Sequence, residues 1–267
     1  MCPVNGNRGL VTPITLTFLL FSFSILTVAT YYFAVSSVKT RVSRLNWVAA
    51  KQDMLLFEDS INSVAWLPSS SIMQSFKGYG GEFETKPELR NLVVNVTLGT
   101  TEQVVFNSSI GYVRYEMPPS DLGEADVHLV GGEEPIINRS FQSSAQMYVR
   151  INGDNQEIYL GYRPLAISFL DASETGITNV VRIFIVNLNS SENLQYTGSF
   201  QVRVRCVNVT TKFWNFNLTD KISLAYVKAA VEGEEGTVSL SLSSSYGFTV
   251  VRLEVLVCNI KIEEVKI

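Results

Sequence analysis

Hydrophobic and polar positions divide the chain into two unequal parts. From Gly9 to Val38 the sequence has no Asp, Glu, Lys or Arg. A helix over this run, at roughly 1.5 Å per residue, is about 40 Å long, which exceeds the ~30 Å hydrocarbon core of a bilayer. The pattern therefore predicts a membrane-inserting helix over residues 10–38, whereas most of the remaining chain has the periodicity of strands.

The apolar helix is predicted to begin at Thr12 and Pro13. Thr12 suits the N-cap position, because its hydroxyl can accept a hydrogen bond from an amide of the first turn. Pro13 suits the first helical position, where its missing N–H costs no hydrogen bond. Pro68 and the serines after it predict that the helix ends near Trp66.

Residues 39–66 are predicted to be an amphipathic continuation of the same helix. Apolar or small residues recur there every three to four positions, and Gln52 interrupts the row. The row consists of Val42, Leu45, Ala49 and Leu56. We expect this face to rest on a globular domain or on neighbouring helices, with the charged residues opposite it.

Residues 88–267 have the alternation of short β-strands, and a Ser- and Gly-rich linker over residues 67–87 precedes them. Strands are predicted at residues 92–96, 103–106, 112–115, 147–151, 157–160, 180–186, 238–242 and 248–258. Asn152-Gly153 predicts a hairpin turn. The predicted fold class is therefore α+β: a long N-terminal helix, apolar then amphipathic, followed by an antiparallel β-sandwich-like domain.

One segment of the β region has a competing pattern. A short helix is predicted from Asp220, as its N-cap, to Val231, with Gly233 as its stop. A strand also fits the alternation of Ile222, Leu224 and Tyr226. Whether the region forms one sandwich or two small sheets stays open at this point.

Arg8 and Gly9 stand directly before the apolar run. A secretory signal peptide has a shorter apolar core, of about 7–15 residues, with a small-residue cleavage site after it. The order found here resembles the class III signal of type IV pilins and related archaeal surface proteins. In that family a prepilin-type peptidase cuts before the apolar run, after a Gly or Ala that follows a basic residue, and the helix is kept for assembly.

The resemblance covers about the first 60 residues and implies that residues 1–9 are a class III leader. Arg8, Gly9 and Leu10 would form the peptidase recognition site, with Leu10 as the mature N-terminus. The segment Val11-Thr12-Pro13-Ile14 is similar to the Val-Ser-Pro-Val-Ile opening common in archaeal pilins. Two departures are that Leu10 adds one residue and that Ile14 replaces the acidic residue of bacterial pilins. The acid is often missing from archaeal members, so its absence favours an archaeal origin.

Two signals disagree on which side of the membrane the C-terminal domain lies. The positive-inside rule places it in the cytoplasm, because Lys39, Arg41, Arg44 and Lys51 follow the apolar run and only Arg8 precedes it. Six Asn-x-Ser/Thr sequons oppose this, against roughly three expected by chance. They begin at Asn95, Asn107, Asn138, Asn189, Asn208 and Asn217. We expect export: a single-pass protein with its C-terminal domain outside, then a cell-surface filament after processing.

Two cysteines remain once Cys2 has left with the leader. Export favours a disulfide between Cys206 and Cys258 over two unpaired thiols. Strand parity complicates the pairing. Cys206 shares the apolar face of residues 200–206, whereas Cys258 shares a face with Arg252 and Glu254 unless a bulge shifts the register.

The sequence has few residues typical of catalysis or cofactor binding. The net charge is −4 and no basic cluster suggests nucleic acid. The single histidine, His128, is expected to be a satisfied polar residue on a strand. The acidic turns Glu133-Glu134 and Glu232-Gly233-Glu234-Glu235 lack the alternating ligands of a calcium loop. We therefore predict no enzyme, no metal and no cofactor.

The predicted function is that of a structural subunit, major or minor, of an archaeal type IV pilus-like surface filament. Its partners would be the prepilin-type peptidase, other pilin-like subunits through the N-terminal helix, and the membrane, with no nucleic acid. The alternative is a single-pass, membrane-anchored extracellular β-domain that binds a ligand or partner without polymerising. An anchored hydrolase is a third hypothesis. Only the pilin hypothesis requires removal of Met1 to Gly9.

Overall fold

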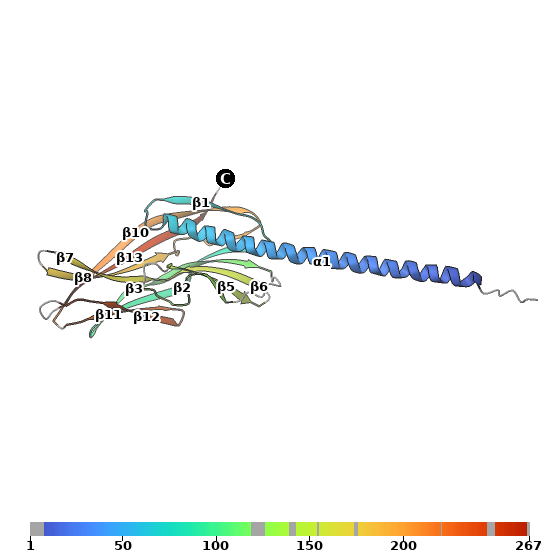
Figure 1. Cartoon of the computed structure of the whole chain (residues 1–267). Helices are drawn as coiled ribbons and strands as arrows, with labels where there is room; N and C mark the ends of the chain where they lie inside the picture. Colours follow the sequence, from blue (N-terminus) through green and yellow to red (C-terminus); the bar gives the residue numbers. More distant parts are fainter. Residues whose placement is uncertain are drawn as a thin grey trace, which may run out of the picture.

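The computed structural model describes residues 8–118, 126–138, 143–153, 155–173, 176–219, 221–244 and 249–265. One helix, α1 (Arg8–Val64), projects from a domain built of strands (Figure 1). The strands are β1 (Ser71–Phe76), β2 (Glu82–Leu98), β3 (Thr101–Met117), β4 (Val127–Val130), β5 (Ala145–Asn152), β6 (Asn155–Tyr162), β7 (Leu165–Ser173), β8 (Gly176–Asn187), β9 (Gln195–Thr197), β10 (Phe200–Leu218), β11 (Leu224–Val231), β12 (Glu234–Ser241) and β13 (Thr249–Glu264). The predicted α+β class, with a helix before a β domain, is confirmed.

The strands form two sheets that pack on each other. One sheet has five strands in the order β1-β10-β13-β8-β7, and the other has the order β12-β11-β2-β3-β6-β5-β4, with β9 paired to β2. Neighbouring strands in the described part of the chain run antiparallel, except that β13 pairs with β8 in parallel. The predicted hairpin at Gly153 joins β5 to β6, and its φ of 61° is the left-handed value that glycine adopts readily.

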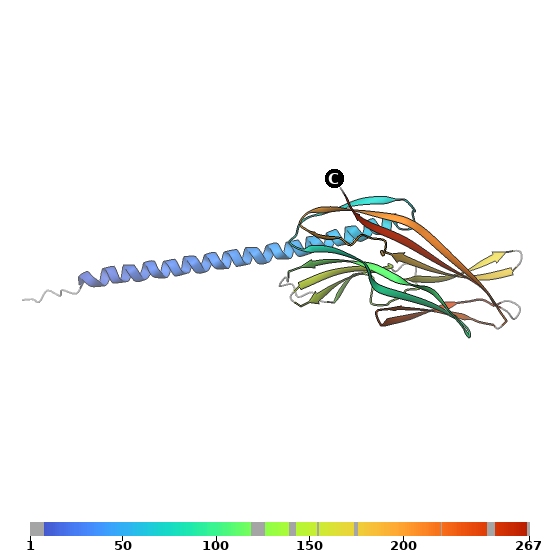
Figure 2. The ribbon, with the colours of Figure 1, turned by 180° about the vertical axis from the view of Figure 1, so that it is seen from behind.

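Two hydrophobic cores lie along the length of the domain. The proximal core contains side chains of α1 between the two sheets, among them Phe57, Phe83 and Leu160. Figure 2 shows the C-terminal end of α1 entering the domain between the two sheets. The distal core contains side chains of strands alone, such as Val94 from β2 and Leu253 from β13. The long strands β2, β3, β10 and β13 contribute to both cores.

The long strands change their buried face where the two cores meet. In β13 the distal core takes Val255 and Val257, whereas the proximal core takes Cys258 and Ile260. β10 has a bulge at the same level, between Cys206 and Asn208. Because side chains alternate with a period of two, such an irregularity moves the next apolar residues to the other face. This bulge lies in β10 and not within residues 251–258: β13 pairs with β8 without a shift from Val251 to Asn259, so Cys258 stays on the face of Arg252 and Glu254, as strand parity predicted.

The structure corrects two predictions about the β region. The helix predicted from Asp220 to Val231 is wrong: strand β11 occupies Leu224–Val231 and pairs with β2 and β12. Alternate residues of β11, such as Ala225 and Val227, are fully buried, so the period of two decided the outcome. The linker predicted at residues 67–87 contains β1 and the start of β2, because β1 pairs along the edge of β10.

The structure also corrects the start of the helix. α1 begins at Arg8, so Thr12 is not its N-cap and Pro13 lies inside it. A proline removes only the bond from its own nitrogen to the carbonyl four residues earlier, here Gly9, so the turn before it can remain helical. The C-terminal end of α1 lies close to the end predicted near Trp66, since α1 ends at Val64 and Trp66 takes a left-handed φ of 67°.

Candidate functional site

The first half of α1 is apolar and entirely uncovered. Among the described residues, Pro13–Val64 is the one helical segment long and apolar enough to cross a membrane. Its most apolar 18-residue stretch has a mean hydropathy of 1.9 and is 0% buried in the domain. Large side chains such as Phe21 and Phe23 are about two-thirds exposed. Since solvent exposure of so much apolar surface is unfavourable, this half needs either lipid or other helices around it.

Several hydroxyl side chains within this half are hydrogen bonded by the helix itself. Five of them donate to the carbonyl four residues earlier at 2.7–2.9 Å: Thr17, Ser22, Ser24, Thr27 and Thr30. A hydroxyl bonded in this way leaves no free donor toward an apolar environment. These residues therefore do not oppose placement of the segment in hydrocarbon.

The second half of α1 is held by one buried face. The buried row is spaced by three to four residues and comprises Trp47, Ala50, Met54, Phe57, Ile61 and Val64. Phe57 makes edge-to-face contacts with Phe76 of β1 and Phe83 of β2, at ring distances of 5.4 and 5.6 Å. This row inserts between the two sheets and fixes the direction in which the first half of α1 leaves the domain.

The apolar row predicted from the sequence is not the one that packs on the domain. Val42, Leu45 and Leu56 are 49%, 69% and 44% exposed, and Ala49 is half-buried. The helix therefore has two apolar rows, one on each side. The sequence argument missed the buried row because Trp47 and Met54 are separated by charged residues such as Lys51, which itself lies 5.9 Å above the Trp47 ring. The outward row, Val38, Val42, Leu45 and Val48, extends the uncovered surface beyond the apolar run.

The residues of the predicted leader lie mostly outside the part of the chain that the structure describes. Residues 1–7 are not described, and Arg8, Gly9 and Leu10 form the first helical turn of α1. The basic residues after the apolar run lie on the uncovered part of α1: Lys39, Arg41 and Arg44 are exposed.

The sequons are spread over the surface of the β domain. Asn107, Asn138, Asn208 and Asn217 are exposed, and Asn95 and Asn189 are half-buried. Asn208 and Asn217 both lie on β10, beyond the part that β1 covers. These four exposed side chains are accessible for modification of the folded domain.

His128 lies in a polar cleft that sequence reasoning did not find. The cleft, of about 620 Å³, brings His128, Tyr148 and Arg90 close to the acidic turns that contain Glu133 and Glu232. Arg90 pairs with Glu232 at 3.1 Å. Among the described residues, no group of three or more His, Cys, Asp or Glu side chains could hold a metal ion. The cleft can therefore offer hydrogen bonds and charges of both signs to a ligand.

Tyrosine rings form the wall beside this cleft. Tyr148 stacks on Tyr159 at a ring distance of 4.8 Å, Tyr159 contacts Tyr112 at 4.6 Å, and His128 lies 5.6 Å from Tyr148. Burial raises the pKa of Tyr159, against the opposing effect of Arg90 to which it is hydrogen bonded, so the phenol stays protonated at neutral pH. Because the rings stack on one another across the strands, their faces are occupied and no open aromatic platform results.

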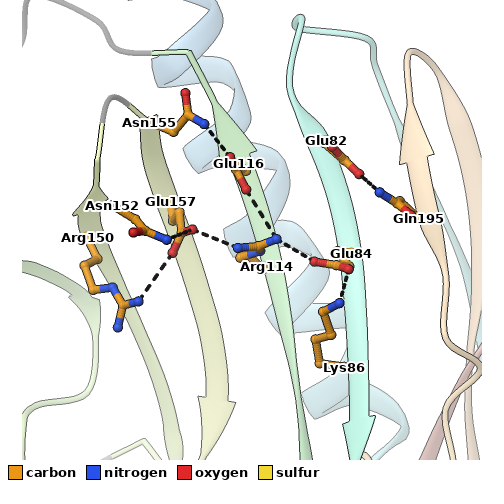
Figure 3. A network of polar contacts seen from close by, with 10 residues as sticks. All are labelled: Glu82, Glu84, Lys86, Arg114, Glu116, Arg150, Asn152, Asn155, Glu157 and Gln195. Carbon is orange, nitrogen blue, oxygen red and sulfur yellow. Dashed lines mark hydrogen bonds and ion pairs between the residues drawn. The ribbon is translucent and has the colours of Figure 1, made fainter. Parts of the chain in front are cut away.

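Arg114 centres a charged network on the outer face of the larger sheet (Figure 3). Its guanidinium donates to Glu84 of β2 at 2.7 Å and to Glu157 of β6 at 2.9 Å, and Glu116 lies 3.3 Å away. Glu84 and Glu157 are buried. A guanidinium bonded to several carboxylates ties neighbouring strands together, so this network holds β2, β3 and β6 in register rather than forming an open site.

The two cysteines of the domain lie side by side. The Sγ atoms of Cys206 and Cys258 are 3.6 Å apart, unbonded, and both residues are fully buried in the proximal core.

No protein-family model, curated protein or solved structure matches this chain. Its function is therefore inferred from its own residues.

Proposed function

We propose that this chain is a structural subunit, major or minor, of an archaeal type IV pilus-like surface filament, held in the membrane by α1 before assembly. The observation that carries the proposal is one continuous uncovered apolar surface. It covers residues 13–38 on all sides and continues along the outward row of Val38, Val42, Leu45 and Val48.

The division of α1 into two halves suits such a subunit. A helix that only anchors a domain needs apolar residues over the bilayer thickness, about 20 of them. Here the apolar row continues on the outward side of the helix while the opposite side is buried in the domain. Neighbouring subunits could pack on this row when the first half leaves the lipid, with van der Waals contact between helices replacing contact with lipid.

The position of Pro13 supports cleavage after Gly9. In the uncut chain Pro13 is the sixth residue of α1 and removes the hydrogen bond to the Gly9 carbonyl. After cleavage Leu10 is the first residue and Pro13 the fourth. The first four N–H groups of a helix have no intrahelical partner, so the proline then costs no bond.

A second function has one observation in its favour. The polar cleft near His128 would suit a membrane-anchored extracellular domain that binds a ligand without polymerising. That function needs neither cleavage after Gly9 nor the outward apolar row, so the two proposals differ in a measurable way.

The deciding experiment is mass analysis of the intact N-terminus of the protein recovered from native membranes, beside a Gly9→Val variant. We expect a mature chain that begins at Leu10, and a variant that keeps its leader because valine disrupts the small-residue cut site. A wild-type chain that still carries residues 1–9 would overturn the pilin proposal and leave the anchored binding domain.

Orientation is tested separately on intact cells. We propose that the β domain lies outside, so a protease added to intact cells should remove it, as followed by an antibody against the domain. Protection of the domain until the cells are lysed would instead agree with the basic residues Lys39, Arg41 and Arg44 and place it in the cytoplasm.

A further inference from the structure

The two buried thiols lie where α1 ends and the sheets begin. Cys206 is on β10 and Cys258 on β13, and these strands are hydrogen-bonded neighbours. The bulge between Cys206 and Asn208 brings the two side chains to the same side, so that the sulfur atoms approach to 3.6 Å. A small change in side-chain torsions would bring them to the ~2.05 Å of a covalent bond.

The chain that leaves α1 is tied to both cysteines. The Trp66 amide donates to the Cys258 sulfur at 3.3 Å, the Ser69 amide to the Cys206 carbonyl at 3.0 Å, and the Cys206 amide to the Ser70 carbonyl at 3.1 Å. Trp66 and Ser69 both have a left-handed φ, of 67° and 70°, which is unfavourable for residues with a side chain. The surrounding contacts, including the Trp66 ring against Phe184 at 5.3 Å, hold this turn in place.

We propose that Cys206 and Cys258 form a disulfide bond that closes the seam between β10 and β13 beneath the end of α1. The inference rests on one part of the proposed function, the export of the β domain, because disulfides persist in oxidising compartments. It does not require leader cleavage or polymerisation. In a filament, part of any pull on the domain passes to α1 through this junction, and the bond would prevent the two strands from separating there.

The reaction is thiol–disulfide exchange with an oxidised dithiol carrier or small-molecule disulfide. One thiolate attacks the oxidant and forms a mixed disulfide, and the second cysteine displaces it. The two thiols lose two protons and two electrons, and the oxidant leaves as two thiols. Burial raises the pKa of Cys258 to about 12, so this residue carries little thiolate in the folded, reduced domain. Because both cysteines are fully buried, an oxidant reaches them before the proximal core closes, and the bond once formed is shielded from reductants until the domain opens.

Differential alkylation of the full-length native protein tests the pair directly. The protein is isolated from membranes without reductant and denatured with one alkylating reagent, then reduced and treated with an isotopically different one. We expect Cys206 and Cys258 to carry only the second label, and a peptide pair joined through them to appear before reduction. The first label on both residues would overturn the proposal.

The same spectra report the N-terminus, so the two proposals fail separately. Free thiols on a chain that begins at Leu10 would overturn the disulfide and leave the pilin function intact. A joined peptide pair on an uncut chain would support the disulfide and overturn the pilin function.

Thermal unfolding supplies a second measurement. Because a bond that closes a loop of this length restricts the unfolded chain, reductant should lower the unfolding midpoint of the native domain by about 5 °C or more. A Cys206→Ala, Cys258→Ala double variant should show no such shift, and Cys2→Ala should respond like the wild type. An equal shift in the double variant would overturn the proposal. Should the double variant fail to fold, the labelling of the native chain decides alone.

Discussion

Both halves of α1 carry large apolar side chains, but the surroundings of these side chains are opposite. Residues 13–38 make no buried contact with the domain, whereas the row that contains Trp47, Met54 and Phe57 lies in the middle of the proximal core. Hydrophobicity along one helix thus indicates that a surface needs covering, but not what covers it. Spacing supplies the missing information: apolar residues all round suit lipid or a bundle, whereas one buried row every three to four residues suits a sheet.

The largest expected effect comes from truncating an aromatic residue in each half. Phe57→Ala leaves a cavity between the sheets and should destabilise the β domain by about 3–5 kcal/mol. Phe21→Ala, in the uncovered half, should leave the unfolding of the domain unchanged, because Phe21 is 64% exposed and touches nothing in it. Chemical denaturation followed by tryptophan fluorescence measures both, and equal losses would show that the halves are not independent.

Acid should destabilise the β domain but have no such effect on the first half of α1. The domain contains a buried carboxylate, whereas residues 13–38 have no charged group. Glu254 of β13 is 3% exposed and accepts hydrogen bonds from Arg182 at 2.6 Å and Arg252 at 2.7 Å. Burial alone raises the pKa of Glu254, but the two guanidinium groups outweigh it and hold the pKa below its ordinary value of 4.5.

A folded-state pKa below the unfolded value means that the folded domain binds fewer protons. The stability from Glu254 is therefore present above about pH 4.5 and is lost as the pH falls through the lower, folded-state pKa. Glu254→Gln should cost about 1–2 kcal/mol at pH 7, from the loss of charge-assisted hydrogen bonds, and less at pH 3. Unfolding free energies of both proteins at the two pH values test this. A difference that stays constant with pH would contradict it.

Strong periodic signals allowed most of the fold to be predicted. The charge-free run and the alternation of β5, β6 and β8 were identified because each has one dominant period. The errors came where two patterns compete. Residues 220–231 have helix-start and helix-stop residues, yet Ala225 and Val227 pack against β2 and make the segment a strand. Likewise, β1 lies within the predicted linker, because its own residues have no strand pattern and pairing with β10, far along the chain, makes it a strand.

The polar features of the domain could not be predicted because they join distant residues. Arg114 meets Glu84 and Glu157 only after three strands have aligned, and the cleft near His128 joins β4 and β5 to the turn between β11 and β12. The cysteine pair could be predicted only in part. The residues were identified from the sequence, but their approach depends on the bulge in β10, which has no local signature in Cys206-Val207-Asn208.

The smallest expected effect on stability, and the sharpest test of what covers the helix, belongs to the outward row. Leu45 is 69% exposed, so Leu45→Lys should change the unfolding free energy of the domain by no more than about 0.5 kcal/mol. If neighbouring subunits pack on this row, the same substitution places a charge in a helix interface and should abolish filaments seen by electron microscopy of the cell surface. Asn62→Lys, on an exposed position of α1 within the domain, is the matched control. Filaments of normal number from the Leu45→Lys protein would show that the outward row faces water, and would confine assembly contacts to residues 13–38.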